Sequence, residues 1–344
     1  MAAERPCELR WTVASAPDRT LLDGALAGGV AALLYGVGEG FVLLMAAGDP
    51  PEMLAVSLPG WPDPSGPAEG SPAGAVASYG DRFLVAYGPA GPERVVLRLR
   101  AVTAVRGRLI PVNAPGAPGS DGAPVLELPA PTPEARPTVL LHAYSRGVVL
   151  GAGFLEAEPA VGTAVVRTPT GAPAAEDVFA WRLAVESGGP GGGRWRLESP
   201  AGPELVRYVG PLGGTALGMT AAGTPVLVPA PPRRAPFAFA DGWVPAPGEA
   251  IRFGNERLVR EEPRAGGGLL AVVYDVRGRV TARLALPSGT RPLAVSRAPD
   301  ELLVLGPDGE PGLCIADQPP RLPTRLDPRG VLASPTTGSG SCGR

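Results

Sequence analysis

The chain has 344 residues, of which 44% are hydrophobic, and a formal net charge of −2. This length allows one large domain or two of ordinary size, with enough apolar residues to bury a core. All 31 basic residues are arginines spread along the chain, so we expect no nucleic-acid partner, and without lysine neither a Walker A loop nor a Schiff base can form.

The N-terminal residues, the cysteines and the single histidine indicate where the protein is located and whether it binds a metal. Charges at Glu4 and Arg5 stand where a secretory signal peptide needs an apolar core. The three cysteines, Cys7, Cys314 and Cys342, are far apart and odd in number. This pattern indicates neither a disulfide framework nor a zinc site. With a single histidine we expect no metal site, and an intracellular protein in a reducing compartment, not a secreted one.

The first strongly apolar stretch, residues 28–47, is long enough to span a membrane and carries Glu39 as its only charge. Gly36, Gly38 and Gly40 divide it at its centre into two short runs. A strand, a turn and a second strand fit this pattern better than a membrane helix. We therefore expect a β-hairpin here and no membrane contact.

Short runs rich in Val, Leu and Ala recur along the whole chain between clusters of Pro and Gly, and 44 prolines disfavour helices. The pattern predicts an all-β protein. The expected strands include residues 41–45, 83–87, 95–99, 139–142, 147–155, 226–228, 269–274 and 302–305.

Composition also predicts the domain organisation. Residues 113–137 are rich in Pro and Gly and are predicted to be a linker. It separates an N-terminal β domain, residues 1–112, from a larger β region, residues 138–330. The last residues, 331–344, follow a Pro-rich stretch and end in a glycine-rich run, which predicts a flexible C-terminal arm.

Four segments carry motifs. Residues 139–150 form a strand, a polar corner with His142 and Arg146, and a second strand. Residues 235–249 read as a strand and a turn that contains Asp241, followed by a strand at 250–253. Residues 272–295 form two strands and a Ser-Gly-Thr-Arg turn ending at Arg291, and residues 338–343 read Gly-Ser-Gly-Ser-Cys-Gly. Taken singly, the first three are ordinary β-hairpins.

Taken in order, these segments resemble the herpesvirus dUTPases, which are single chains of two fused all-β domains. Residues 141–147 resemble the family's motif with the catalytic aspartate, 235–249 its hairpin, 272–295 its strand pair, and 338–343 its terminal arm. The resemblance implies two fused dUTPase-like β-barrel or sandwich domains with a glycine-rich arm. It also implies hydrolysis of dUTP to dUMP and diphosphate with Mg²⁺.

This chain departs from the family where the chemistry takes place. His142 replaces the aspartate that activates water, Ser145 replaces the tyrosine beneath the deoxyribose, and Ser339 replaces the aromatic residue that stacks on uracil. The family's Gly-Arg-Ser-Ser phosphate turn is missing. The resemblance therefore favours a dUTPase-related pseudoenzyme that acts through contacts with host or viral proteins over an active dUTP diphosphatase.

If a site is retained, the resemblance assigns catalytic roles to His142 and Asp241. An alternative alignment of the hairpin motif onto residues 176–181 puts Asp177 in place of Asp241. Substrate binding is assigned to Arg146, Arg291, Gly338, Ser339, Gly340, Ser341 and Gly343. The small-molecule partner would be dUTP, and the protein would be a monomer in the nucleus or cytoplasm of a host cell.

Two other interpretations stay open. Residues 273–289, followed by 298–305, resemble one blade of a β-propeller and the start of the next, and a propeller would be a binding platform and not a hydrolase. Only one such copy is visible, although blades recur every 40–50 residues or so. The other interpretation is a structural interaction protein that needs no pocket. Radial four-stranded sheets would identify the propeller.

Overall fold

Strands dominate the computed structural model, and the helix among its described residues is the single turn α1 (Arg329–Leu332). The all-β prediction is confirmed. The structure describes residues 2–38, 40–58, 71–79, 82–90, 94–110, 117–118, 124–129, 136–144, 147–157, 164–167, 181–185, 195–198, 205–212, 215–220, 222–228, 235–246, 249–254, 256–265, 267–320, 322–332 and 336–337. From residue 110 to residue 208 it describes only the backbone of the strands.

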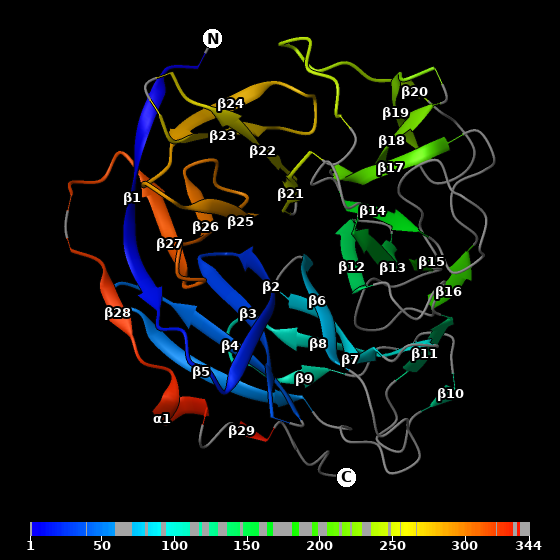
Figure 1. The fold of residues 1–344 in the computed structure, drawn as a ribbon, viewed down its shortest axis with the longest axis vertical. Coiled ribbons are helices and arrows are strands. Elements are labelled where there is room, and N and C mark those ends of the chain that lie inside the picture. The colour runs from blue at the N-terminus through cyan, green and yellow to red at the C-terminus, as the bar shows by residue number, and fades with distance from the viewer. Residues whose placement is uncertain are drawn as a thin grey trace.

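The strands form sheets that stand around a common centre (Figure 1). We call them blades 1 to 6 in chain order; the nine-stranded sheet contains blades 5 and 6, joined through β1. Blade 1 contains β2 (Arg19–Ala27), β3 (Val30–Val37), β4 (Gly40–Ala47) and β5 (Glu52–Leu58). Blade 2 contains β6 (Ser71–Tyr79), β7 (Arg82–Ala90), β8 (Arg94–Thr103) and β11 (Pro124–Pro129), with the short β9 (Leu109–Ile110) and β10 (Ala117–Pro118) at its edge.

Blades 3 to 6 repeat this arrangement. Blade 3 contains β12 (Arg136–Tyr144), β13 (Gly147–Ala157), β15 (Trp181–Val185) and β16 (Trp195–Glu198), with β14 (Ala164–Arg167) paired to β13. Blade 4 contains β17 (Leu205–Leu212), β18 (Thr215–Thr220), β19 (Pro225–Val228) and β20 (Ala235–Pro236). Blade 5 contains β21 (Ile251–Phe253), β22 (Leu258–Pro263), β23 (Leu269–Tyr274) and β24 (Val280–Ala285). Blade 6 contains β25 (Arg291–Val295), β26 (Glu301–Leu305), β27 (Pro311–Ala316) and β1 (Glu4–Val13).

The first strands of the blades form a closed inner ring. β2 contacts β6, β6 contacts β12, β12 contacts β17, β17 contacts β21, β21 contacts β25, and β25 contacts β2. Sheets of about four strands arranged radially around one axis are the architecture of a β-propeller. The expected sign of the propeller interpretation is therefore present, whereas the finer expectation of two fused dUTPase-like barrels is not confirmed.

The N-terminal strand closes the ring. β25, β26 and β27 come from the C-terminal part of the chain, and β1 pairs antiparallel with β27 as the fourth strand of blade 6. Before that, residues 4–6 of β1 pair parallel with the end of β24 in blade 5. A single strand thus joins the first residues of the chain to its last two blades.

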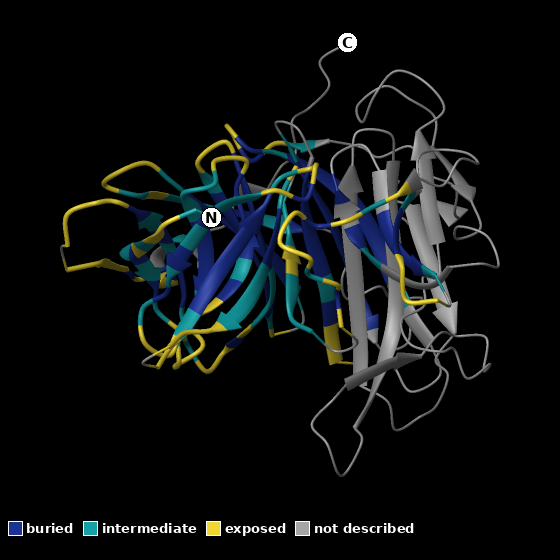
Figure 2. Cartoon of the chain, turned by 90° about the horizontal axis from the view of Figure 1, so that it is seen from above, coloured by how far each residue is buried: buried dark blue, intermediate teal, exposed yellow. Residues whose placement is uncertain are grey.

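Neighbouring blades pack face to face, which explains why their strands are apolar on both sides. On β3, Ala32 and Leu34 belong to a core cluster shared with blade 2, whereas Leu33 and Tyr35 belong to a cluster shared with blade 6. A strand covered on both faces needs a continuous apolar run because successive side chains point to opposite faces. Buried residues accordingly follow the strands, and exposed ones gather in the connections (Figure 2).

The predicted strands and the predicted hairpin are confirmed. Each of the eight expected strands lies within an observed strand, from β4 to β26. The predicted hairpin at 28–47 is the β3–β4 hairpin, which spans residues 30–47, with Gly38 at a φ of 55° in its turn. Among the described residues no helix is long and apolar enough to cross a membrane. The predicted linker, 113–137, contains β10 and β11, and β11 pairs with β8.

The expectation that the cysteines form no disulfide is wrong for two of them. Cys7 in β1 and Cys314 in β27 form a disulfide, because the neighbouring pairs Cys7–Ala316 and Leu9–Cys314 bring their Cα atoms to 5.7 Å. The sequence did not predict this pairing because 307 positions separate the two cysteines. They become neighbours only when β1 pairs with β27 and closes the ring.

The C-terminal segment continues from blade 6 onto blade 1. β28 (Thr324–Leu326) pairs parallel with β1, and β29 (Thr336–Thr337) pairs parallel with β5. Between them, Val331 packs against the core cluster shared by blades 6 and 1. The described residues of the predicted arm, 331–332 and 336–337, therefore lie against the ring.

Candidate functional site

The residues predicted to form a site fall on different blades. His142 lies on β12, the inner strand of blade 3, opposite Val149, and its side chain is outside the described part of the chain. Arg146, Asp177 and the arm residues Gly338, Ser339, Gly340, Ser341 and Gly343 are also outside it. Arg291 begins β25 of blade 6 and is exposed. Asp241 lies in the connection from blade 4 to blade 5, where it has several partners.

Asp241 belongs to a group of aromatic and charged side chains that we call the blade 5 cluster. Its members are Phe237, Phe239, Asp241 and Trp243 from the connection, with Arg260 from β22 and Tyr274 from β23. The predicted strand at the start of this connection ends after two residues, as β20, and the chain then continues irregularly. The strand expected at 250–253 is β21.

The rings of the cluster are packed against one another. The Phe239 ring lies 4.4 Å from that of Trp243 and 5.0 Å from that of Tyr274, measured between centroids. Trp243 stacks on Tyr274 at 5.2 Å with 22° between the ring planes. Offset stacking and edge-on contacts are the favourable arrangements of aromatic rings, so the connection is fixed to blade 5.

Hydrogen bonds run through the cluster in one direction. Arg260 Nε donates to the Tyr274 hydroxyl at 2.8 Å, and this hydroxyl donates to Asp241 Oδ2 at 2.7 Å. Asp241 Oδ1 also accepts from the backbone N–H of Trp243 at 3.2 Å, which closes the turn after Asp241. The three side chains therefore hold one another in a single arrangement.

The charges in this network fix its protonation. Burial raises the pKa of Asp241, but the hydrogen bonds from Tyr274 and Trp243 and the charge of Arg260 outweigh it, so the pKa lies below its usual value. Burial raises the pKa of Tyr274 further above its ordinary range. Asp241 is thus ionised and Tyr274 is protonated near neutral pH. A general base works best with a pKa near the operating pH, so Asp241 is better suited to positioning Tyr274 and Trp243 than to activating water.

Arg260 links the rings to further carboxylates. Its guanidinium carbon lies 5.3 Å from the centroid of the Trp243 ring, within the range of a cation–π contact. Its Nη2 forms an ion pair with Glu262 at 2.9 Å. On the other side, Trp243 Nε1 donates to Glu249 at 3.1 Å. The indole is therefore held in place while Trp243 stays half-buried.

The cluster reaches the surface through apolar residues. Val244, next to Trp243, is 50% exposed, and Val276 is 38% exposed in the turn after β23. Gly278 of the same turn lies against Phe237 and Phe239. Tryptophan, tyrosine and arginine are the residues most enriched at the energetic centres of protein interfaces, so this surface has the composition of a docking site.

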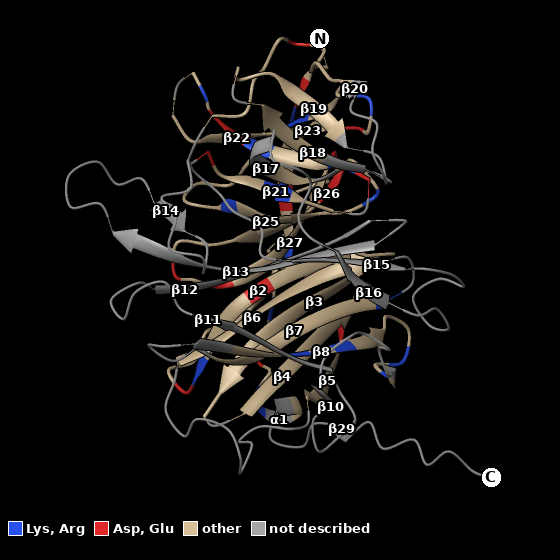
Figure 3. Ribbon diagram, turned by 90° about the vertical axis from the view of Figure 1, so that its right-hand side faces the viewer, with Lys and Arg blue, Asp and Glu red and all other residues tan. Residues whose placement is uncertain are grey.

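The sequence contained a signal for part of this site. The alternating aromatic residues from Phe237 to Trp243 and the Asp-Gly turn predict a hairpin, and Asp241 is the member of the cluster that the sequence predicts as a site residue. The sequence did not predict Arg260 and Tyr274 as partners of Asp241, because these contacts form only when blade 5 has folded. Elsewhere, charges of both signs are interspersed over the described residues (Figure 3). No three His, Cys, Asp or Glu side chains form a metal-binding group within the described ranges.

No protein-family model and no curated protein matches this chain. Three solved structures are similar in outline. The AfRom2 CNH domain is 11% identical, with a TM-score of 0.36 over 91% of this chain and 98% of that domain. The WD40 domain of Toxoplasma gondii coronin is 13% identical, with a TM-score of 0.30 over 88% of this chain and 68% of its own. A puromycin-hydrolyzing peptidase of Mycobacterium tuberculosis is 12% identical, with a TM-score of 0.30 over 89% of this chain and 56% of its own. At these scores the propeller architecture rests on the blade topology alone.

Proposed function

We propose that this chain is a binding platform that takes up a protein partner at the blade 5 cluster. The observation that carries the proposal is the half-buried Trp243, held between Tyr274, Arg260 and Glu249 beside the exposed Val244. An aromatic side chain that is already fixed loses little conformational entropy when a partner covers it. The rigid blade beneath supports such an anchor.

The test uses substitutions at exposed valines, which leave the packed rings in place. Val244→Asp puts a charge at the centre of the proposed contact. Val105→Asp is the matched control, because Val105 is 83% exposed in the turn between β8 and β9 of blade 2. We expect a partner recovered by cross-linking to the wild-type chain to be lost with Val244→Asp and kept with Val105→Asp.

The affinity of that partner, measured by calorimetry with purified components, should fall about tenfold or more in Val244→Asp. A partner that binds both variants equally would place the contact elsewhere on the ring. Recovery of no partner that depends on Val244 would reject the proposal. Circular dichroism of both variants checks that the fold is kept.

Hydrolysis of dUTP with Mg²⁺ remains the second candidate function, and it depends on the resemblance of residues 141–147, 235–249, 272–295 and 338–343 to dUTPase motifs. Among the predicted site residues, Asp241 is the carboxylate that the structure describes, and it is engaged by Tyr274 and Trp243. We therefore assign no Mg²⁺ ligand to it. Turnover of dUTP by the full chain, lost in a chain cut after Pro335 or in Arg291→Ala, would favour this function. No turnover by a folded protein would leave the binding platform.

A further inference from the structure

The Cys7–Cys314 disulfide sits where the ring closes. Cys7 lies on β1 and Cys314 on β27, and 307 positions of sequence separate them. Cys7 is 4% exposed and Cys314 is fully buried, both within the core cluster between blades 5 and 6. The bond thus ties the first strand of the chain to its last blade.

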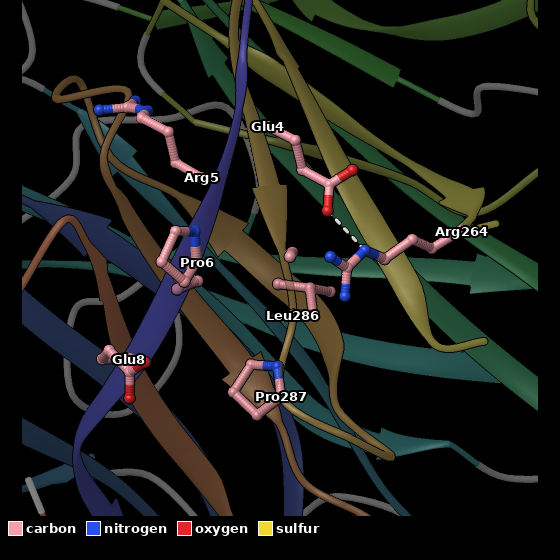
Figure 4. A pocket seen from close by; sticks show the side chains of 9 residues that line it. Glu4, Arg5, Pro6, Glu8, Arg264, Leu286 and Pro287 are labelled. Atoms are coloured by element: carbon pink, nitrogen blue, oxygen red, sulfur yellow. Dashed lines mark ion pairs between the residues drawn. The ribbon is translucent and has the colours of Figure 1, made fainter. Parts of the chain in front are cut away.

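Cys7 also borders a groove. A groove of about 380 Å³ opens where β1 leaves β24 and turns toward β27, and Cys7 is part of its wall. Figure 4 shows Glu4 and Arg264 facing each other across this groove, joined by an ion pair, with Leu286 and Pro287 along the wall. Cys314 is not among its lining residues.

Four charged residues are among those that line the groove: Glu4, Glu8, Arg5 and Arg264. Arg5 is engaged by Asp300 and Asp317, and Arg264 by Glu4. Both guanidiniums are therefore already paired with carboxylates, so the groove favours a small neutral molecule over an anion.

We propose that this pair is a thiol–disulfide exchange site that a small dithiol reduces through the groove, releasing β1 from its covalent link to blade 6. One thiolate of the dithiol attacks Sγ of Cys7, and Cys314 leaves as a thiolate that takes up a proton. The second thiol of the dithiol then displaces Cys7, which is protonated in turn. Two electrons and two protons pass to the protein, and the dithiol becomes a disulfide.

The released strand changes the ring locally. With the disulfide formed, β1 is held by its covalent bond and by its pairing with β27, β24 and β28. After reduction the covalent bond is gone, and β1 is held by strand pairing, by the ion pairs of Glu4 and Arg5 and by the packing of Trp11 and Val13. The N-terminal segment then opens more often, and the edges of β24 and β27 become accessible.

The first experiment counts thiols in the full chain, purified in air and then denatured. We expect one free thiol, that of Cys342, and three after dithiothreitol, with a peptide linking Cys7 to Cys314 in the unreduced digest. Three free thiols before reduction would overturn the proposal.

The second experiment follows proteolysis of the native protein after β1, around residues 14–18. Dithiothreitol should speed this cleavage about tenfold or more and lower the melting temperature. Cys314→Ser should behave like the reduced wild type and not respond further, whereas Cys342→Ser should respond like the wild type. Equal cleavage of the wild type with and without dithiothreitol would overturn the proposal, even if a cysteine variant does not fold.

The route through the groove has its own test. Glu8→Trp fills the groove from β1, and Glu8→Gln removes the same charge without adding bulk. We expect dithiothreitol to reduce Glu8→Trp several-fold more slowly than Glu8→Gln, measured by trapping free thiols with a maleimide over time. Equal rates in the two variants would show that reduction needs opening of the whole blade, which contradicts entry through the groove.

Discussion

Asp23 lies on β2, where the inner strands of blades 1 and 2 meet. Its Oδ2 accepts a hydrogen bond from the backbone N–H of Val76 on β6 at 2.8 Å. The residue is half-buried as a whole, yet enclosure of its carboxyl group raises the pKa to about 6, against the hydrogen bonds from Val76 and Gly24 and the charge of Arg252. The charged form of Asp23 therefore destabilises the fold.

We expect Asp23→Asn to stabilise the protein near neutral pH. In the unfolded chain Asp23 ionises at about pH 4, whereas in the folded chain it does so at about pH 6. Between these values the folded state binds more protons, so this group lowers the free energy of unfolding as the pH rises, by about 2–3 kcal/mol in total. Asparagine keeps the acceptor and loses this effect.

Chemical denaturation at about pH 4 and about pH 7.5 checks the prediction. The gain of Asp23→Asn over the wild type should appear at the higher pH and vanish at the lower. A variant that is less stable than the wild type at both values would show that the charge itself is needed at this junction.

Asp241 has the opposite dependence. Its pKa is lowered in the folded state, so its stabilising contribution is present above the unfolded pKa and disappears as the pH falls through the folded one. Asp241→Asn should cost about 1 kcal/mol near pH 7, because the hydrogen bond from Tyr274 loses its charged acceptor. The difference should shrink toward about pH 2 in urea unfolding curves. A pH-independent difference would point to lost packing instead.

At the scale of single elements, Gly254 lies where blades 5 and 6 approach each other closely. A Cβ built on Gly254, which follows β21, would lie 1.9 Å from the backbone oxygen of Val295 on β25. That oxygen is part of the main chain, so a side chain at this position forces blades 5 and 6 apart.

We expect Gly254→Ala to reduce the free energy of unfolding by about 1–3 kcal/mol. Gly40→Ala is the control, because a Cβ on Gly40 would meet no atom nearer than 3.6 Å and its backbone is not left-handed. Thermal unfolding of both variants separates the clash from the general effect of replacing glycine. Equal melting temperatures for the two would contradict this close approach.

Individual strands were predictable because their signal is local. The run Leu269 to Tyr274 is β23 residue for residue, since an uninterrupted apolar segment between turn residues fits a strand that is covered on both faces. Likewise, the three glycines predicted a turn at the right place: Gly38 lies in the β3–β4 turn, whereas Gly36 and Gly40 lie in the strands beside it.

The arrangement of those strands could not be read in the same way. The link from Asp241 to Tyr274 joins residues 33 positions apart, and the pairing of β1 with β27 joins the two ends of the chain. No short motif specifies either contact, because each depends on which blades become neighbours. The resemblance to dUTPases rested on the order of short motifs along the chain. It therefore contained no information on which blades pack against each other.

For the whole molecule, we expect removal of residues 2–13 to prevent closure. Without β1, the cluster shared by blades 6 and 1 loses Trp11 and Val13, and blade 6 presents an open edge at β27. The shortened chain should unfold at a clearly lower temperature and self-associate in size-exclusion chromatography.

A synthetic peptide of residues 2–15, added in trans, should restore the monomer-sized peak. A chain that ends at Thr337 is the control for shortening in general. If the chain without residues 2–13 melts like the full chain, β1 is an accessory strand and the ring closes by other contacts.

The position of β1 also has a consequence for synthesis. β1 leaves the ribosome before the strand it pairs with, and Cys314 on that strand follows Cys7 by 307 residues. At about 5–20 residues per second, β1 waits for about 15–60 s before β27 exists. Throughout that time its apolar side, with Trp11 and Val13, is available to chaperones. The moment at which β27 has been synthesised, and not the folding of any earlier blade, sets the earliest time at which β1 can pair with it and close the ring.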